Sequence, residues 1–145
     1  MRSLRPAVLA VTAALFSVSA LAAEHRLQPG QYEMKTEMKM EGVEHAIPPT
    51  TRTHCYSADD VKDDKKLAQG GEERSKDCEM TDMKTAGSRM TWSMTCKSGT
   101  KGTGEMTYAG DGYDMTLNLE TAGGPHGPMK MKVHTTARRT GDCAK

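Results

Sequence analysis

The sequence predicts a mainly β protein, a single antiparallel meander of about seven strands with one short helix, stapled by disulfides. Apolar residues recur at every second position over much of the chain, and turn residues separate these segments at regular intervals. Four cysteines lie far apart along the chain. The pattern leaves open whether the strands form a curved sheet, a small barrel or a sandwich.

Residues 1–22 predict a secretory signal peptide. The chain begins with the positively charged "MRSLRP", continues with the apolar run "AVLAVTAALFSVSA" and reaches a small-x-small cleavage site at Ala20-Leu21-Ala22. We therefore expect a periplasmic or secreted protein whose mature chain, residues 23–145, is one β-rich domain. No later segment approaches the ~18 apolar residues that a membrane-spanning helix needs.

The mature chain has an almost balanced charge and an unusual set of apolar residues. Loss of Arg2 and Arg5 lowers the Lys and Arg count from 20 to 18, against 19 Asp and Glu, so the formal net charge falls from +1 to about −1. We expect no nucleic-acid partner, because no basic field is present. Phe is absent beyond the signal and 11 of the 12 Met lie there, so methionine must form much of the core.

The first two strands and the helix follow the signal. "YEMKTEMKME", residues 32–41, predicts a half-buried strand, and "TTRTHCY", residues 50–56, predicts a second one. The apolar face of the first strand would hold Tyr32, Met34, Thr36, Met38 and Met40. "SADDVKDDKKLAQGG" predicts a short helix, with Asp59 and Asp60 in its first turn, Lys65 and Lys66 in its last turn, and Gly70-Gly71 as its end.

The rest of the chain predicts a series of hairpins, each registered by its turn. A three-residue turn "AGS" at 86–88 predicts the same-face pairs Cys78–Cys96, Met80–Met94, Lys84–Met90 and, as the misfit, Asp82–Trp92. A turn "SGT" at 98–100 predicts the pairs Cys96–Gly102, Met94–Gly104 and Trp92–Met106. The turn "AGDG" at 109–112 predicts the pairs Tyr108–Tyr113, Met106–Met115, Gly104–Leu117 and Gly102–Leu119.

A last strand, "MKMKVHTTARR", completes the predicted sheet. Its apolar positions are Met129, Met131 and Val133, and Lys130, Lys132 and His134 would face solvent.

The cysteines predict two disulfides. Their number is even, the chain carries an export signal, and no C-x-x-C is present. The hairpin register pairs Cys78 with Cys96, because directly opposed cysteines suit bridge geometry. Exclusion then pairs Cys55 with Cys143.

Several motifs together resemble a known family. They are "PGQYEMKTEMKM", "THCYSADDVKD", "CEMTDMKTAGSRMTWSMTC", "GTGEMTYAGDGYDMTL" and the terminal "RRTGDC". The chain resembles the domain-of-unknown-function 3617 family of exported bacterial proteins over nearly the whole mature length. The resemblance implies Met-rich strands with four cysteines and brings no established activity.

Catalytic motifs are not found. The sequence has no G-x-S-x-G, H-E-x-x-H, Walker A or G-x-G-x-x-G motif, and "SGTK", Ser98 to Lys101, matches S-x-x-K only in a predicted turn. Asp111 and Asp114 lack the alternating oxygen ligands of a calcium loop. The histidines are scattered over loops and solvent-facing positions: His25, His45, His54, His126 and His134. We expect a non-catalytic protein without a cofactor.

The segment "SRMTWSMTC" poses the main functional question. Its alternating Met90, Trp92, Met94 and Cys96 predict either the apolar face of a strand or a soft-metal site beside an aromatic ring. We favour the core, because these positions share the only face that can be buried. The prediction is a non-catalytic binding or envelope-associated module.

Two other functions stay open. Copper(I) handling is the first alternative, with thioether ligands from the two M-x-M motifs, Met38-Lys39-Met40 and Met129-Lys130-Met131. A carrier of a small apolar ligand is the second, because a curled sheet with flexible methionine walls suits varied apolar molecules.

Overall fold

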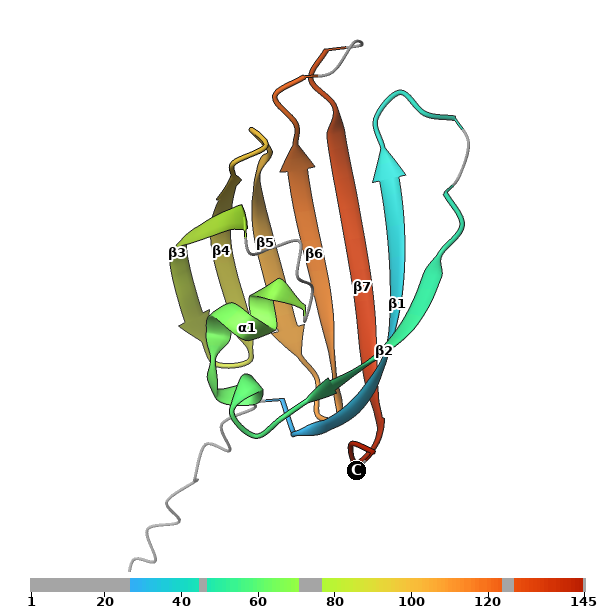
Figure 1. Cartoon of the computed structure of the whole chain (residues 1–145), viewed down its shortest axis with the longest axis vertical. Coiled ribbons are helices and arrows are strands. Elements are labelled where there is room, and N and C mark those ends of the chain that lie inside the picture. Colours follow the sequence, from blue (N-terminus) through green and yellow to red (C-terminus); the bar gives the residue numbers. More distant parts are fainter. Residues whose placement is uncertain (1–26, 45–46, 71–76, 124–126, 145) are drawn as a thin grey trace, which may run out of the picture.

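The computed structural model describes residues 27–44, 47–70, 77–123 and 127–144, so the predicted signal peptide lies outside the described residues. Seven strands form one antiparallel sheet in the order β2-β1-β7-β6-β5-β4-β3 (Figure 1). The strands are β1 (Gly30–Met40), β2 (Thr50–Tyr56), β3 (Cys78–Ala86), β4 (Arg89–Cys96), β5 (Lys101–Tyr108), β6 (Gly112–Glu120) and β7 (Lys130–Gly141). The predicted fold class is confirmed, and the sheet is open, with β2 and β3 at its edges.

The order of the strands explains where the helix lies. From β3 to β7 each strand pairs with the next one, and β7 then pairs with β1, which carries β2 on its other side. The connection from β2 to β3 must therefore pass from one edge of the sheet to the other. It contains a 3-10 helix η1 (Asp60–Lys62) and the helix α1 (Asp64–Gln69), which lies across one face of the sheet (Figure 1).

The helical segment differs from the prediction in where the helix begins. Asp63 has an extended backbone, and its carboxylate accepts hydrogen bonds from the amides of Lys65 and Lys66 at 2.9 and 3.2 Å. A side chain that caps in this way starts a new helix, so the predicted single helix is divided at Asp63. Gly70 ends α1 in the left-handed conformation, with φ of 60°, as its place in the sequence predicts.

The core lies between α1 and the inner face of the sheet, defined here as the face that carries Trp92. Its buried apolar residues are Leu27, Tyr32, Met34, Tyr56, Val61, Leu67, Ala68, Met90, Trp92, Met106, Tyr108, Tyr113, Met115 and Ala137. Met90 is 0% exposed and Trp92 is 2% exposed. The core interpretation of "SRMTWSMTC" is therefore confirmed for these two side chains.

The β3–β4 hairpin has the predicted pairs at its open end but not at its turn. Gly87 and Ser88 alone form the turn, and the register shifts between Thr81 and Lys84, where Asp82 has a positive φ of 53°. The turn is one residue shorter than predicted, and the bulge adds one residue to β3, so the predicted pairing returns beyond the bulge. The structure thus confirms the pairs Cys78–Cys96 and Met80–Met94, whereas the predicted pairs Lys84–Met90 and Asp82–Trp92 are wrong.

The β4–β5 hairpin differs by two residues from the predicted register. Trp92 faces Gly104 and Met90 faces Met106, whereas Met94–Gly104 and Trp92–Met106 had been predicted. Residues 97–100 connect the strands, and Gly99 takes a φ of 84° that favours glycine. The packing explains the register, because a Cβ at position 104 would overlap the indole ring of Trp92.

The last two hairpins largely follow the prediction. The register of β5 against β6, including Tyr108–Tyr113 and Met106–Met115, is confirmed. Met131 and Val133 lie half-buried on β7, but Met129 precedes the strand and is 43% exposed, so its predicted place on the apolar face is wrong. Its amide and carbonyl bind Thr121 across the loop, which holds it outside the sheet.

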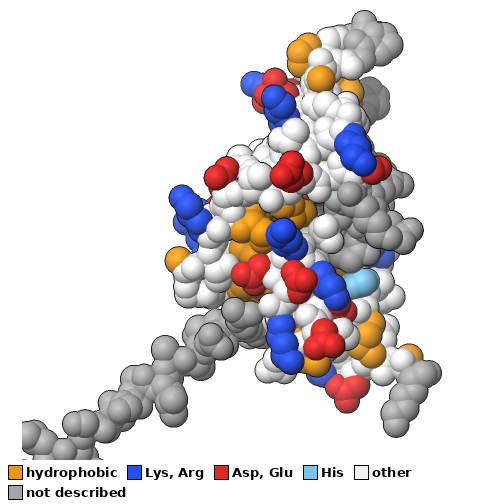
Figure 2. All heavy atoms as spheres, turned by 60° about the vertical axis from the view of Figure 1, so that its left-hand side comes forward, with side chains coloured by type: hydrophobic (Ala, Val, Ile, Leu, Met, Phe, Trp, Pro, Cys, Tyr) orange, Lys and Arg blue, Asp and Glu red, His pale blue; other side chains and the backbone are white. Residues whose placement is uncertain are grey.

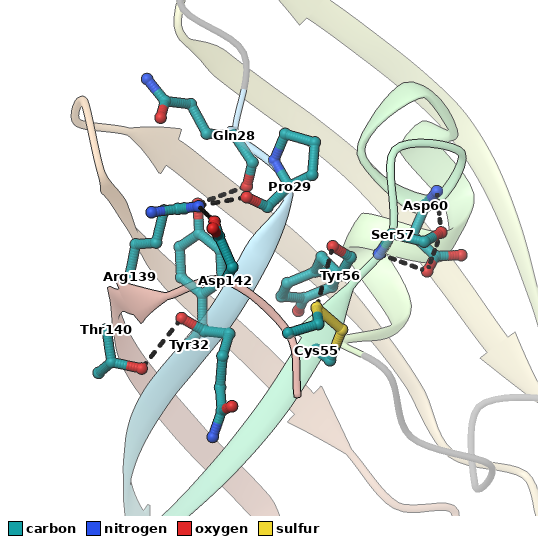
Figure 3. The surroundings of a disulfide bond; sticks show 12 residues. Gln28, Pro29, Tyr32, Cys55, Tyr56, Ser57, Asp60, Arg139, Thr140 and Asp142 are labelled. Carbon is teal, nitrogen blue, oxygen red and sulfur yellow. Dashed lines mark hydrogen bonds and ion pairs between the residues drawn. A yellow bond between two sulfur atoms is a disulfide. The ribbon is translucent and has the colours of Figure 1, made fainter. Parts of the chain in front are cut away.

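Two disulfides join the predicted cysteine pairs. Cys78–Cys96 links the adjacent strands β3 and β4, and Cys55–Cys143 links β2 to the chain beyond β7. Figure 3 shows the second bridge beside Tyr56, with Arg139 turned toward the chain before β1. There the guanidinium of Arg139 donates to the carbonyl of Pro29 at 2.9 Å. The start of β1 and the end of β2 are thus both fixed to the C-terminal end of β7 and the residues that follow it.

Candidate functional site

One row of apolar side chains crosses the inner face near the end of the sheet where β1 ends and β7 begins. Cross-strand pairing places its members side by side on six strands: Met80, Met94, Gly102, Leu119, Met131 and Met40. All six are half-buried. We call this set the apolar row. The helix α1 lies over the other half of the sheet, beside Thr85 and Met115.

The next row connects the apolar row to the core. It consists of Trp92, Gly104, Leu117, Val133 and Met38, again one residue per strand. Met80, Met94 and Leu117 pack against the buried cluster. Figure 2 shows hydrophobic side chains exposed on one side of the molecule, with acidic and basic side chains around them. The apolar face of the sheet thus continues from the closed core to solvent.

Trp92 has one unusual polar atom. Its indole Nε1 is buried, and no hydrogen-bond acceptor lies within reach in the described part of the chain. A buried donor without a partner costs about 1–3 kcal/mol. Trp92 lies two positions from Met94 along β4, so this buried donor is beneath the surface next to the apolar row.

A group of three tyrosines forms the opposite end of the core. The rings of Tyr32, Tyr56 and Tyr113 lie within 6.5 Å of one another between centroids, and the hydroxyls of Tyr56 and Tyr113 are 3.0 Å apart in a buried hydrogen bond. Burial raises the pKa of all three phenols, that of Tyr32 to about 12. These hydroxyls therefore stay protonated at neutral pH and serve as packed hydrogen-bonding groups.

The two described histidines lie apart from each other. His54 packs edge-on against Tyr56, with ring centroids 4.5 Å apart, and burial lowers its pKa, helped by Arg52. His134 lies 3.3 Å from the carboxylate of Asp114 on the other face. His25, His45 and His126 lie outside the described residues. No group of three or more His, Cys, Asp or Glu side chains suited to a metal occurs among the residues described.

The methionines of the copper alternative are divided by the fold. Met40 faces Met131 directly, and Met38 lies two residues from Met40 on the same face, so three thioethers gather at the end of β1 and β7. Met90 instead is fully buried, and the Tyr108 hydroxyl donates to its sulfur at 3.9 Å. The exposed Met129 does not join the group.

The other sequence candidates occupy turns and exposed strand positions. Ser98 lies in the β4–β5 turn and Lys101 begins β5, so these two residues are not one helical turn apart. Asp111 is exposed in the β5–β6 turn, and Asp114 is exposed on β6 beside His134.

The outer face, opposite Trp92, carries a polar row that the sequence analysis did not identify. Lys39 faces Lys132, which in turn neighbours Asn118 and Thr103 on the next strands. Two open grooves, of about 640 and 590 Å³, share Thr103, Asn118 and Lys132 in their lining. Lysines alternate with apolar residues in both strands, at Lys39 and at Lys130 and Lys132, but Lys39 and Lys132 come together only because β1 pairs with β7.

Comparison with known proteins gives one match. A family model described as a protein of unknown function (DUF3617) matches residues 27–143, which include all seven strands and the four cysteines. No curated protein and no solved structure matches the chain.

Proposed function

Since the chain belongs to the DUF3617 family, which has no known function, we propose from the geometry that it is a non-catalytic binding module of the bacterial cell envelope. Its ligand is an elongated apolar molecule held on the apolar row. The observation that carries the proposal is the row of five half-buried methionine and leucine side chains across six strands, with Gly102 at the β5 position, next to a closed core.

The dimensions and chemistry of the row favour an elongated apolar ligand. Six adjacent strands span roughly 24 Å, which suits an extended acyl chain. Each CH₂ group removed from water contributes about 0.8 kcal/mol, so contact along part of the row is enough for micromolar binding. Methionine walls adapt to ligands of different shape.

Export is supported by the state of the cysteines. All four form disulfides, which are typical of oxidising compartments outside the cytoplasm. No helix among the described residues is long and apolar enough to cross a bilayer.

Intrinsic fluorescence gives a direct test, because Trp92 is the only tryptophan in the chain. We expect palmitate, titrated below its aggregation limit, to change the Trp92 emission of the parent protein saturably. Met94→Glu places a charge in the apolar row and should weaken binding at least tenfold. Thr95→Glu adds the same charge at the next, exposed position of β4 and serves as the matched control.

The proposal fails if the parent shows no saturable change. It fails equally if Met94→Glu and Thr95→Glu bind palmitate alike while both retain the parent's circular dichroism and melting temperature.

Copper(I) handling is a second candidate, favoured by the three thioethers of Met38, Met40 and Met131. Copper(I) takes soft sulfur ligands, and a cross-strand pair with a neighbour two residues away brings three of them to one surface. Anaerobic titration with Cu(I) against a competing chelator tests it. Stoichiometric uptake that is lost in Met40→Leu/Met131→Leu, but kept in Met90→Leu/Met94→Leu, would favour copper.

A further inference from the structure

Two exposed apolar side chains mark one end of the sheet. Val43 and Met129 are 49% and 43% exposed, and they are the exposed large hydrophobic residues of the described ranges. Val43 follows β1 and Met129 precedes β7, and the amide of Glu41 donates to the carbonyl of Lys130 at 3.0 Å, so the two loops start side by side. Figure 1 shows the described parts of both loops at the end of the sheet opposite the C-terminus.

Four lysines lie on the strands near these loops, and Glu120 lies directly between two of them, Lys101 and Lys130. Lys39 and Lys132 are directly opposed on neighbouring strands, an arrangement that is unfavourable for two like charges. Lys101 and Lys130 lie one row nearer the loops. Within the described part of the chain, no salt bridge joins any of these four lysines to a carboxylate. An anion from another molecule would relieve the repulsion between Lys39 and Lys132.

The groove at this end combines both kinds of surface. Its volume is about 640 Å³, and it is lined by the four lysines, by Glu41 and Glu120, and by apolar residues of the strand ends, among them Met40, Leu119 and Met131. Lysines outnumber carboxylates by two in the lining, whereas the mature chain as a whole has a slight negative charge. The groove thus has more lysines than carboxylates, and Val43 itself lies between Glu41 and Glu44 in the sequence.

We propose that this end of the protein docks on the surface of an anionic lipid bilayer. Val43 and Met129 enter the interfacial region, and Lys39 and Lys132 bind lipid phosphates. Apolar tips flanked by lysines match a bilayer, which presents acyl chains beneath a layer of phosphate. A second copy of the chain is a poorer partner, because it would bring the same lysines together. The lysines and loop residues that make the docking contacts lie outside the apolar row, and the groove shares only Met40, Gly102, Leu119 and Met131 with that row.

Cosedimentation of the mature protein with vesicles tests the proposal. We expect binding to vesicles of phosphatidylcholine mixed with phosphatidylglycerol, weak or no binding to phosphatidylcholine alone, and a decrease as salt is added. Lys39→Gln/Lys132→Gln should weaken binding roughly 25-fold, since each lysine near an anionic surface contributes about fivefold. Val43→Ser/Met129→Ser should weaken it at least tenfold. Lys65→Gln/Lys84→Gln makes the same charge change elsewhere and should stay within about twofold of the parent.

Defined outcomes would overturn the proposal. Equal binding to both kinds of vesicle would do so, as would Val43→Ser/Met129→Ser binding like the parent. If inorganic phosphate displaced the parent protein from vesicles and bound the parent and Val43→Ser/Met129→Ser with equal affinity, the site would be one for a free anion. Self-association that Val43→Ser/Met129→Ser abolishes, without vesicle binding, would indicate a second copy as the partner. Met94→Glu should still bind vesicles, which separates this test from that of the apolar ligand.

Discussion

The contact between Trp92 and Gly104 offers a test of the β4–β5 register. In the structure the indole ring lies over Gly104, and a Cβ at this position would overlap the ring. Gly104 lacks a positive φ, so alanine strains the packing rather than the backbone. We expect Gly104→Ala to lower the free energy of unfolding by about 1–3 kcal/mol, the usual cost of overpacking. Trp92→Ala alone should cost about 3–5 kcal/mol, because the ring is almost fully buried.

A double-mutant cycle separates this contact from general damage to the sheet. Once Trp92 is alanine, the space above position 104 is open, and Gly104→Ala should cost close to nothing. The coupling free energy should therefore match most of the cost of Gly104→Ala in the parent, at about 1–3 kcal/mol. Urea denaturation followed by far-ultraviolet circular dichroism measures all four proteins, because removal of Trp92 removes the fluorophore. Additive effects, within about 0.5 kcal/mol, would refute the register.

Two other predictions concern the disulfides and the ionisation of His54. The chain-entropy relation gives about 4.6 kcal/mol for Cys55–Cys143, which closes 88 residues, and about 3.2 kcal/mol for Cys78–Cys96, which closes 18. Replacing both cysteines of a bridge by serine should therefore lower the urea midpoint more for Cys55–Cys143 than for Cys78–Cys96. Peptide mapping without reduction should recover both bridges. Burial holds the pKa of His54 below its unfolded value of 6.5, so its contribution to stability is complete above that pH and is lost as the pH falls. His54→Gln should reduce the loss of melting temperature between neutral and mildly acidic pH, and an unchanged pH profile would contradict the burial of the imidazole.

The alternation of faces could be predicted from the sequence because it is local, and so could the place of each turn, but not the length of every turn. The period of two places Tyr32 and Met34 on the inner face whatever the strands pair with. The β5–β6 register was also accessible, since "AGDG" leaves Tyr108 and Tyr113 no other apolar partner close by. The pair Cys78–Cys96 was predicted correctly although the turn was not, because the bulge near Asp82 compensates for the shorter turn.

The β4–β5 register could not be fixed in the same way. A slip of one residue exchanges the two faces, but a slip of two keeps every side chain on its face, so apolar alternation does not distinguish the two registers. The register depends on the shape of the side chains, because the ring of Trp92 needs a neighbour without a side chain. Gly102 and Gly104 both satisfy the alternation, and only the three-dimensional packing of the ring selects Gly104.

The candidate surfaces depend on a contact that joins distant parts of the chain. Met40 and Met131, like Lys39 and Lys132, meet only because β7 pairs with β1 rather than ending the meander at an edge. No local pattern encodes this pairing. Each M-K-M motif is therefore visible in the sequence by itself, but the contact between Met40 and Met131, and the place of Met129 outside the strand, are not.

The size of α1 accounts for the apolar row. A helix of six residues is about 9 Å long, whereas seven strands extend over roughly 29 Å, so α1 can close only part of the inner face. The part that it covers holds the aromatic residues and fully buried methionines, and the part beyond it holds methionine and leucine that stay half-exposed. A sheet that needed only stability would carry polar side chains on the uncovered part, as its outer face does. Apolar residues kept there are consistent with a second molecule completing the core, and methionine suits both states because its flexible thioether packs against solvent-facing neighbours as well as against a ligand.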